Sequence, residues 1–125
     1  MCNPNLNSPS LMLARQSLRD SMSRAGWDDA RIFDAELALA ELIVNAWRHG
    51  RTASPVVLIA IDGLTLRVSV GDESHDLPEQ RRSPALGELA ECGRGLQLVE
   101  GLTQRWGADP QKRGKLVWFE LDSAA

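Results

Sequence analysis

The sequence predicts an α/β fold of two layers, in which a mixed, mostly antiparallel sheet carries helices on one face. Three observations lead to this fold class. Two segments with helical periodicity come first, two strand-like segments joined by an Asp-Gly pair follow, and a third helical segment precedes a last strand-like segment. The chain has 125 residues, enough to bury one core. We therefore expect a flexible tail over residues 1–8 and a single domain over residues 9–122.

The first helix is expected to begin at Pro9, because proline suits the first helical position and Ser8 before it can act as the cap. Gly26 is expected to end it. One face of this helix is apolar at helical spacing, through Leu11, Ala14, Leu18, Met22 and Ala25.

The second helix is expected to begin at Asp28 or Asp29, either of which can cap it, and to run to about His49, before Gly50. From residue 37 to residue 47 it is apolar nearly all round, which is typical of a buried helix.

Three polar residues, Glu41, Asn45 and His49, interrupt this apolar helix at a spacing of four, so they share one face. An ionised carboxylate in apolar surroundings is costly unless it has partners or a chemical role. An asparagine oxygen can bind Mg²⁺, and a carboxylate one turn away can take a proton from an attacking hydroxyl. The alternative is ordinary buried hydrogen bonding, with the histidine favoured by the helix dipole.

Strands are expected in VVLIAI and LTLRVSV, joined at Asp62-Gly63, and in the final KLVWFEL. Between the hairpin and the last strand lie a polar connection over residues 71–95, the helix GLQLVEGLTQRW and a loop with Pro110 and Gly114. A connection this long is usually functional or mobile.

Bulk composition narrows the classes of function. The net charge of -3 argues against a general nucleic-acid surface, and no apolar run reaches the roughly 18 residues of a membrane span. We find no signal peptide, and the two cysteines have no metal-site spacing. We therefore expect a cytoplasmic protein that contacts neither membrane nor nucleic acid directly.

Two further motifs follow the hairpin. Asp72 comes at a strand end, where a carboxylate can accept a hydrogen bond from an exocyclic amine, although a turn or cap role is the alternative. The sequence Gly93-Arg94-Gly95-Leu96 opens a helix, and glycines at a helix N-terminus let phosphates approach the backbone; a plain helix cap is the alternative.

Taken in order, these motifs resemble those of the GHKL, or Bergerat-fold, ATP-binding superfamily. Glu41 and Asn45 match the ExxxN pattern of its N box. Asp72 matches the adenine-binding aspartate of the next box, and Gly93 and Gly95 match the GxGL box.

Four stretches narrow the resemblance: ELIVNAWRHG, VSVGDES, GRGLQLVEGLTQRWG and GKLVWFEL are similar to the anti-sigma-factor and serine-kinase-like subgroup, especially its small stand-alone members in actinomycetes. The resemblance covers about residues 11–122. It implies a Bergerat sandwich that binds ATP and Mg²⁺, with an antagonist (anti-anti-sigma-like) protein or a sigma factor as partner. Whether the chain is a monomer or a homodimer stays open.

The resemblance also assigns roles to residues. Glu41 would be the general base, Asn45 would ligate Mg²⁺ and Asp72 would bind the adenine amino group. A lid would span about residues 75–92. The other positions that the resemblance places at the nucleotide are His49, Gly50, Ser74, Pro78, Gly93, Arg94, Gly95 and Leu96.

Two positions depart from the pattern. Relatives often carry a threonine that helps a water bridge adenine to the aspartate, and Leu116 stands at that place. We therefore expect one pocket hydrogen bond to be missing, a loss of about 1 kcal/mol. Trp47 is bulky where relatives have a small aliphatic residue, and we expect it to pack in the core.

These observations leave two main hypotheses. The first is a serine kinase and anti-sigma-like regulator, which the presence of Glu41 favours. The second is a non-catalytic, nucleotide-gated binding module, which Leu116 favours. A histidine-kinase catalytic domain or a chaperone ATPase ranks lower, because phosphoacceptor helices and a second domain are missing from the sequence, and a DNA-binding regulator ranks lowest.

Overall fold

The computed structural model describes residues 9–48, 52, 55–73 and 95–123. Its elements, in chain order, are α1 (Pro9–Arg24), α2 (Asp29–Arg48), β1 (Val56–Asp62), β2 (Thr65–Asp72), α4 (Gly95–Leu102), β3 (Arg105–Gln111) and β4 (Gly114–Asp122). Among these, no helix is both long and apolar enough to cross a membrane.

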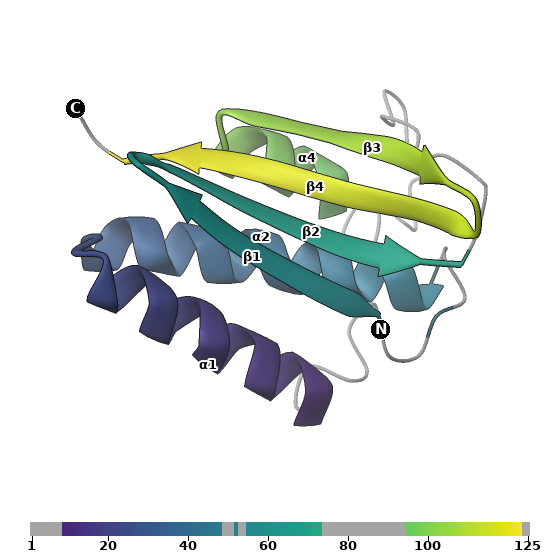
Figure 1. Ribbon diagram of the computed structural model, residues 1–125, viewed down its shortest axis with the longest axis horizontal. Coiled ribbons are helices and arrows are strands. Elements are labelled where there is room, and N and C mark those ends of the chain that lie inside the picture. Colours follow the sequence, from purple (N-terminus) through teal and green to yellow (C-terminus); the bar gives the residue numbers. More distant parts are fainter. Residues whose placement is uncertain (1–8, 49–51, 53–54, 74–94, 124–125) are drawn as a thin grey trace, which may run out of the picture.

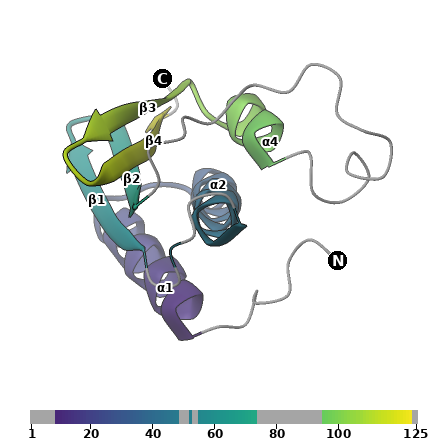
Figure 2. The same ribbon diagram turned by 90° about the vertical axis from the view of Figure 1, so that its right-hand side faces the viewer.

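The molecule has two layers, which confirms the predicted fold class. The four described strands pair in the order β1-β2-β4-β3, and every pairing is antiparallel. The three described helices lie on one face of this sheet (Figures 1 and 2). The helix α2 packs against the central strands β2 and β4, while α1 lies beside β1 and α4 beside β3.

The core forms where α2 meets the sheet. Alternate residues of β2 and β4 point toward the helices, so each strand has one buried row, and α2 is buried on most sides as its sequence predicts. Burying each large apolar side chain contributes roughly 1.5–3 kcal/mol. The most completely buried large residues are Leu11, Leu18, Met22, Leu39, Leu42, Ile43, Leu66, Val68, Val70, Val99, Phe119 and Leu121.

The helix boundaries follow the expected capping residues. The side chain of Asp28 accepts a hydrogen bond from the backbone N–H of Arg31 at 2.8 Å, so Asp28 is the N-cap of α2. Gly26, with φ of 85°, follows the end of α1, and the N–H of Trp27 donates to the carbonyl of Met22 at 3.0 Å. Trp47 is partly buried and packs against the core, as predicted.

The region after α4 corrects the sequence prediction. The expected helix through Trp106 ends at Leu102, and residues 105–111 form the edge strand β3 instead of a loop. The Thr103 hydroxyl donates to the carbonyl of Val99 at 2.7 Å, which satisfies a group at the helix end. Pro110 is compatible with β3 because this strand is at the sheet edge, where one side needs no hydrogen-bond donor.

The hairpin turn lies one residue later than predicted. Asp62 pairs with Thr65, so Gly63 and Leu64 are the two turn residues. Gly63 has φ of 63°, the positive angle that tight hairpin turns require at their first central position.

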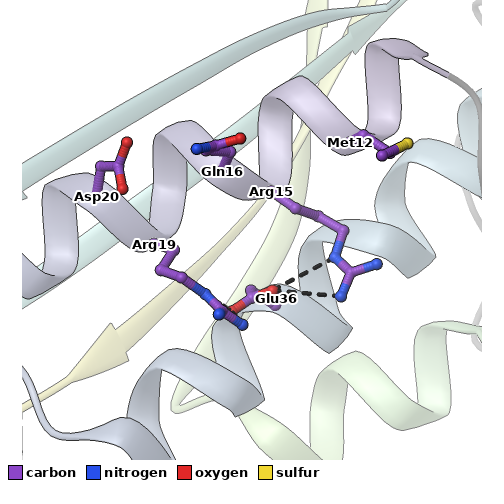
Figure 3. A pocket seen from close by; sticks show the side chains of 6 residues that line it. All are labelled: Met12, Arg15, Gln16, Arg19, Asp20 and Glu36. Carbon is purple, nitrogen blue, oxygen red and sulfur yellow. Dashed lines mark hydrogen bonds and ion pairs between the residues drawn. The ribbon is translucent and has the colours of Figure 1, made fainter.

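Two ion pairs connect α1 to α2. The Glu36 side chain is 6% exposed and contacts Arg19 at 2.7 Å and Arg15 at 3.3 Å, while the two arginines remain 60% and 45% exposed (Figure 3). The described residues that line the groove around Glu36 belong to α1 and α2 and not to the strand ends described below. The arginines compensate the buried carboxylate and keep the two helices in register.

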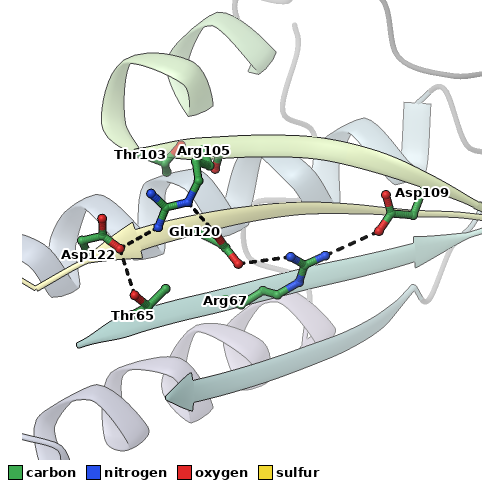
Figure 4. Close-up of polar contacts among 7 residues, drawn as sticks. All are labelled: Thr65, Arg67, Thr103, Arg105, Asp109, Glu120 and Asp122. Atoms are coloured by element: carbon green, nitrogen blue, oxygen red, sulfur yellow. Dashed lines mark hydrogen bonds and ion pairs between the residues drawn. The ribbon is translucent and has the colours of Figure 1, made fainter. Parts of the chain in front are cut away.

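The sheet face that carries no described helix holds a charge network (Figure 4). Arg105 donates to Glu120 at 2.6 Å and to Asp122 at 2.7 Å, and these hydrogen bonds lower the pKa of both carboxyl groups. Arg67 lies 4.1 Å from the centroid of the Trp118 ring and donates to Glu120 at 3.1 Å. The network therefore covers the open side of β2, β4 and β3.

Candidate functional site

Asp72 is the last residue of β2 and lies on the buried side of the sheet. It continues the inward-facing row of Leu66, Val68 and Val70, and it is 4% exposed. Lys115 of β4 pairs with Asp72 in the sheet register, and the Lys115 Nζ donates to the Asp72 Oδ1 at 2.9 Å. The two side chains are 2% and 1% exposed, so this is a buried ion pair on the helix side of the sheet.

Leu116, at the place where relatives often carry a threonine, points away from Asp72, and the expected loss of one pocket hydrogen bond stays a prediction. Side chains alternate along a strand, so residues 115 and 116 point to opposite faces. Leu116 pairs with Gly71, and its Cδ2 would lie 3.3 Å from a Cβ added there, on the face away from Asp72. The residue that reaches Asp72 is Lys115, so the chemistry of the carboxylate depends on position 115 and not on Leu116.

Backbone contacts fix the end of β2. Gly114 has φ of 92°, and a Cβ at this position would overlap the carbonyl oxygen of Asp72 at 1.9 Å. The N–H of Glu73 donates to the Thr52 hydroxyl at 2.9 Å, and the N–H of Thr52 donates to the carbonyl of Ala46 in α2 at 3.1 Å. Thr52 thus joins the last turns of α2 to the residue after Asp72.

Glu41 and Asn45 lie one turn apart in the C-terminal half of α2, and both are half-buried among the core residues of that helix. Burial raises the pKa of the Glu41 carboxyl, because a charged carboxylate is less stable away from water. Figure 1 shows that α2 and β2 end at the same end of the molecule. Glu41 and Asn45 in α2 therefore lie toward the same end of the fold as the Asp72–Lys115 ion pair.

The remaining predicted site residues divide into two groups. Gly95 and Leu96 form the start of α4, and this helix packs against α2 and β3. Outside the described residues lie His49, Gly50, Ser74, Pro78, Gly93, Arg94 and the predicted lid, residues 75–92.

Sequence reasoning did not identify Lys115, Thr52 or Gly114 as part of this site. A signal for Lys115 was present, because Val117, Phe119 and Leu121 alternate as an inward-facing row and residue 115 is the next position of that row. A charged residue in such a row needs a partner, and Asp72 is that partner.

The described groups fit a purine nucleotide with Mg²⁺. The Asp72 carboxylate is an acceptor for an exocyclic amine, and the Asn45 amide offers a neutral oxygen for a hard cation. The first turn of α4 has backbone N–H groups at the end that favours anions. Glu41, with its raised pKa, is a candidate for proton transfer.

Comparisons with known proteins place the chain in a family. The model of the histidine kinase-like ATPase domain matches residues 5–121, which covers α1 through all but the last residue of β4. The comparison with curated proteins returned no match. Together with the two-layer fold, the match shows that this chain belongs to the histidine kinase-like ATPase domain family.

Proposed function

We propose that the chain binds ATP with Mg²⁺ and, in the manner of anti-sigma-factor serine kinases, phosphorylates a serine of an antagonist protein, binds a sigma factor, or does both. The observation that carries this proposal is Glu41. It is a half-buried carboxyl with a raised pKa, one turn before Asn45, in a chain whose family has an ATP-binding fold.

The proposed reaction gives Glu41 one task. The serine hydroxyl oxygen forms a bond to the γ-phosphorus, the bond from that phosphorus to the β,γ-bridging oxygen breaks, and ADP leaves. Glu41 accepts the proton of the hydroxyl. A base works best when its pKa is near the working pH, and burial moves the Glu41 carboxyl in that direction.

The other residues of the site would bind and orient the nucleotide. Asn45 is proposed to ligate Mg²⁺ and Asp72 to accept a hydrogen bond from the adenine amine. The backbone N–H groups of the first turn of α4, which begins at Gly95, are proposed to bind the phosphates. Phosphoryl transfer depends mainly on such positioning and on electrostatic stabilisation, so a small domain with one base is sufficient for it.

A second candidate function is a non-catalytic, nucleotide-gated protein-binding module. The buried Asp72–Lys115 pair favours it, because a carboxylate already bound to an ammonium is a weaker acceptor for adenine than a free one. In this case the nucleotide would control partner binding without phosphotransfer.

The test is transfer of labelled γ-phosphate to candidate antagonist proteins by wild type, Glu41→Gln and Asp34→Asn. Asp34 is a half-buried carboxylate on the same helix and serves as the matched control. The kinase proposal predicts that Glu41→Gln lowers the transfer rate by about 100-fold or more and that Asp34→Asn leaves it nearly unchanged.

The two candidate functions give different results in a second assay. ATP-dependent partner binding that survives in Glu41→Gln, together with no phosphate transfer by wild type, supports the binding module and contradicts the kinase.

A further inference from the structure

Thr52 is a buried polar residue between α2 and β1, and its hydrogen bonds connect two segments that are distant in the sequence. It is 8% exposed. Its hydroxyl accepts a hydrogen bond from the backbone N–H of Glu73 at 2.9 Å, and its own N–H donates to the carbonyl of Ala46 at 3.1 Å. Thr52 therefore links the last turns of α2 to the residue that follows β2.

These two contacts lie next to residues of the proposed nucleotide site. Ala46 follows Asn45, the proposed Mg²⁺ ligand, and Glu73 follows Asp72. Both α2 and β2 end at this end of the molecule (Figure 1). The hydrogen bonds of Thr52 thus connect the helix that carries Asn45 to the strand that carries Asp72.

Hydrogen bonds fix the relative position of a helix and a strand more tightly than apolar contact does. Elsewhere α2 packs on β2 through apolar side chains, and the hydrophobic effect has no preferred direction. A hydrogen bond keeps its two heavy atoms about 2.7–3.2 Å apart, whereas a shift of α2 by one residue would move Asn45 by about 1.5 Å. A displacement of about 1 Å at a reacting group costs about 100-fold in rate, so a nucleotide site requires this precision.

We propose that Thr52 is a positioning residue of the nucleotide site, which holds the Asn45 turn of α2 where its amide reaches Mg²⁺ on the phosphates. Thr52 itself contacts neither nucleotide nor metal. This inference rests on the proposed ATP and Mg²⁺ site. It applies to the kinase and to the binding module alike, because both use the nucleotide.

The experiment is calorimetric titration of ATP, once with Mg²⁺ and once with EDTA, into wild type, Thr52→Val, Thr52→Ser and Thr65→Val. Valine keeps the shape of threonine without its hydroxyl, and serine keeps the hydroxyl. Thr65 is the matched control, because its hydroxyl donates to Asp122 at 3.0 Å at the other end of β2 (Figure 4).

The quantity that decides is the Mg²⁺ effect, the ratio of the two ATP affinities of one protein. A loss of stability alone leaves this ratio unchanged in the folded protein. We expect Mg²⁺ to strengthen ATP binding to wild type, and Thr52→Val to reduce the Mg²⁺ effect by about tenfold, the factor for one lost hydrogen bond. ATP affinity in EDTA should change by about twofold or less, because Asn45 has no metal to bind. Thr52→Ser and Thr65→Val should keep the Mg²⁺ effect of wild type.

Two outcomes with the variants overturn the proposal. An unchanged Mg²⁺ effect in folded Thr52→Val makes Thr52 a purely structural residue. Equal loss of the effect in Thr52→Ser shows that the hydroxyl is not the group responsible.

Should Thr52→Val not fold, wild type supplies the test, because coupling between two sites is reciprocal. If the bond between Thr52 and Glu73 favours metal binding, Mg²⁺ must slow hydrogen exchange of the Glu73 amide in the ATP complex, by up to about tenfold. Equal exchange rates of this amide with and without Mg²⁺ overturn the proposal.

Failure of the underlying site gives a different result. If wild type binds no ATP under either condition, the proposed nucleotide site is wrong. If it binds ATP equally with and without Mg²⁺, Asn45 is not a metal ligand and leaves Thr52 nothing to position. An Mg²⁺ effect of wild type that persists in Thr52→Val contradicts only the role of Thr52.

Discussion

Replacing Gly114 by alanine is expected to destabilise the fold more than replacing Gly26, although both glycines have positive φ angles. Gly114 has φ of 92° and Gly26 has φ of 85°, so the conformational cost of a side chain is similar at the two positions, about 1–2 kcal/mol. The surroundings differ. A Cβ at Gly26 meets nothing within 4 Å, whereas one at Gly114 would lie 1.9 Å from the Asp72 carbonyl oxygen.

The clash of the added Cβ with Asp72 sets the difference in the free energy of unfolding between the two variants. The contact at Gly114 is with backbone, so β2 and β4 must separate locally, and overpacking of this kind costs about 1–3 kcal/mol. The reduced entropy of the unfolded chain offsets about 0.4–1 kcal/mol in both variants. Gly26→Ala is therefore expected to cost about 1 kcal/mol and Gly114→Ala about 2–4 kcal/mol.

Urea unfolding monitored by tryptophan fluorescence measures both free energies of unfolding. The reasoning predicts that Gly114→Ala loses at least about 1 kcal/mol more than Gly26→Ala, with an unchanged denaturant slope. Equal losses in the two variants would refute the close approach of Gly114 to Asp72. Gly114→Ala should also weaken ATP binding, because the strain acts on the residue proposed to contact the base.

Three further predictions concern charged groups. Burial raises the pKa of the Glu41 carboxyl, so ionised Glu41 destabilises the fold above the ordinary carboxyl pKa, and this effect vanishes at lower pH. Glu41→Gln should therefore raise Tm at pH 7. In calorimetry at a series of pH values, this gain in Tm should disappear by about pH 4. Arg19→Ala removes one partner of the buried Glu36 carboxylate and should lower the free energy of unfolding in urea by about 1–2 kcal/mol. Glu36→Met should lower it less, because the two arginines that lose their partner are exposed and can be hydrated. Arg105→Gln should raise the pKa of Glu120 toward its ordinary value in an NMR titration; an unchanged pKa would contradict the 2.6 Å hydrogen bond.

Much of the fold could be predicted because hydrophobic periodicity is strong where burial is deep. The apolar residues of α2 are continuous enough to predict a buried helix, and Asp28 marks its start. In contrast, β3 has the sequence RWGADPQ, which contains few strand-forming residues. Its conformation comes from pairing with β4, a tertiary effect that local sequence does not carry.

The site could be predicted only in part for a similar reason. Glu41, Asn45 and Asp72 stood out because polar residues interrupt apolar patterns. Lys115 did not stand out, because it lies at the start of its strand and its partner Asp72 is 43 residues away in the sequence. Only the register of β2 against β4 brings the two residues together, and register also decides that Leu116 points away.

The most direct test of the central claim is calorimetric titration of ATP with Mg²⁺ into wild type, Asp72→Asn and Asp109→Asn, each checked for folding by circular dichroism. Asp109 is an exposed carboxylate on the opposite face of the sheet and serves as the control. The account predicts saturable binding to wild type and Asp109→Asn and a loss of about tenfold or more in Asp72→Asn. Absence of binding to folded wild type, or equal binding to all three proteins, would contradict a nucleotide site at the end of β2.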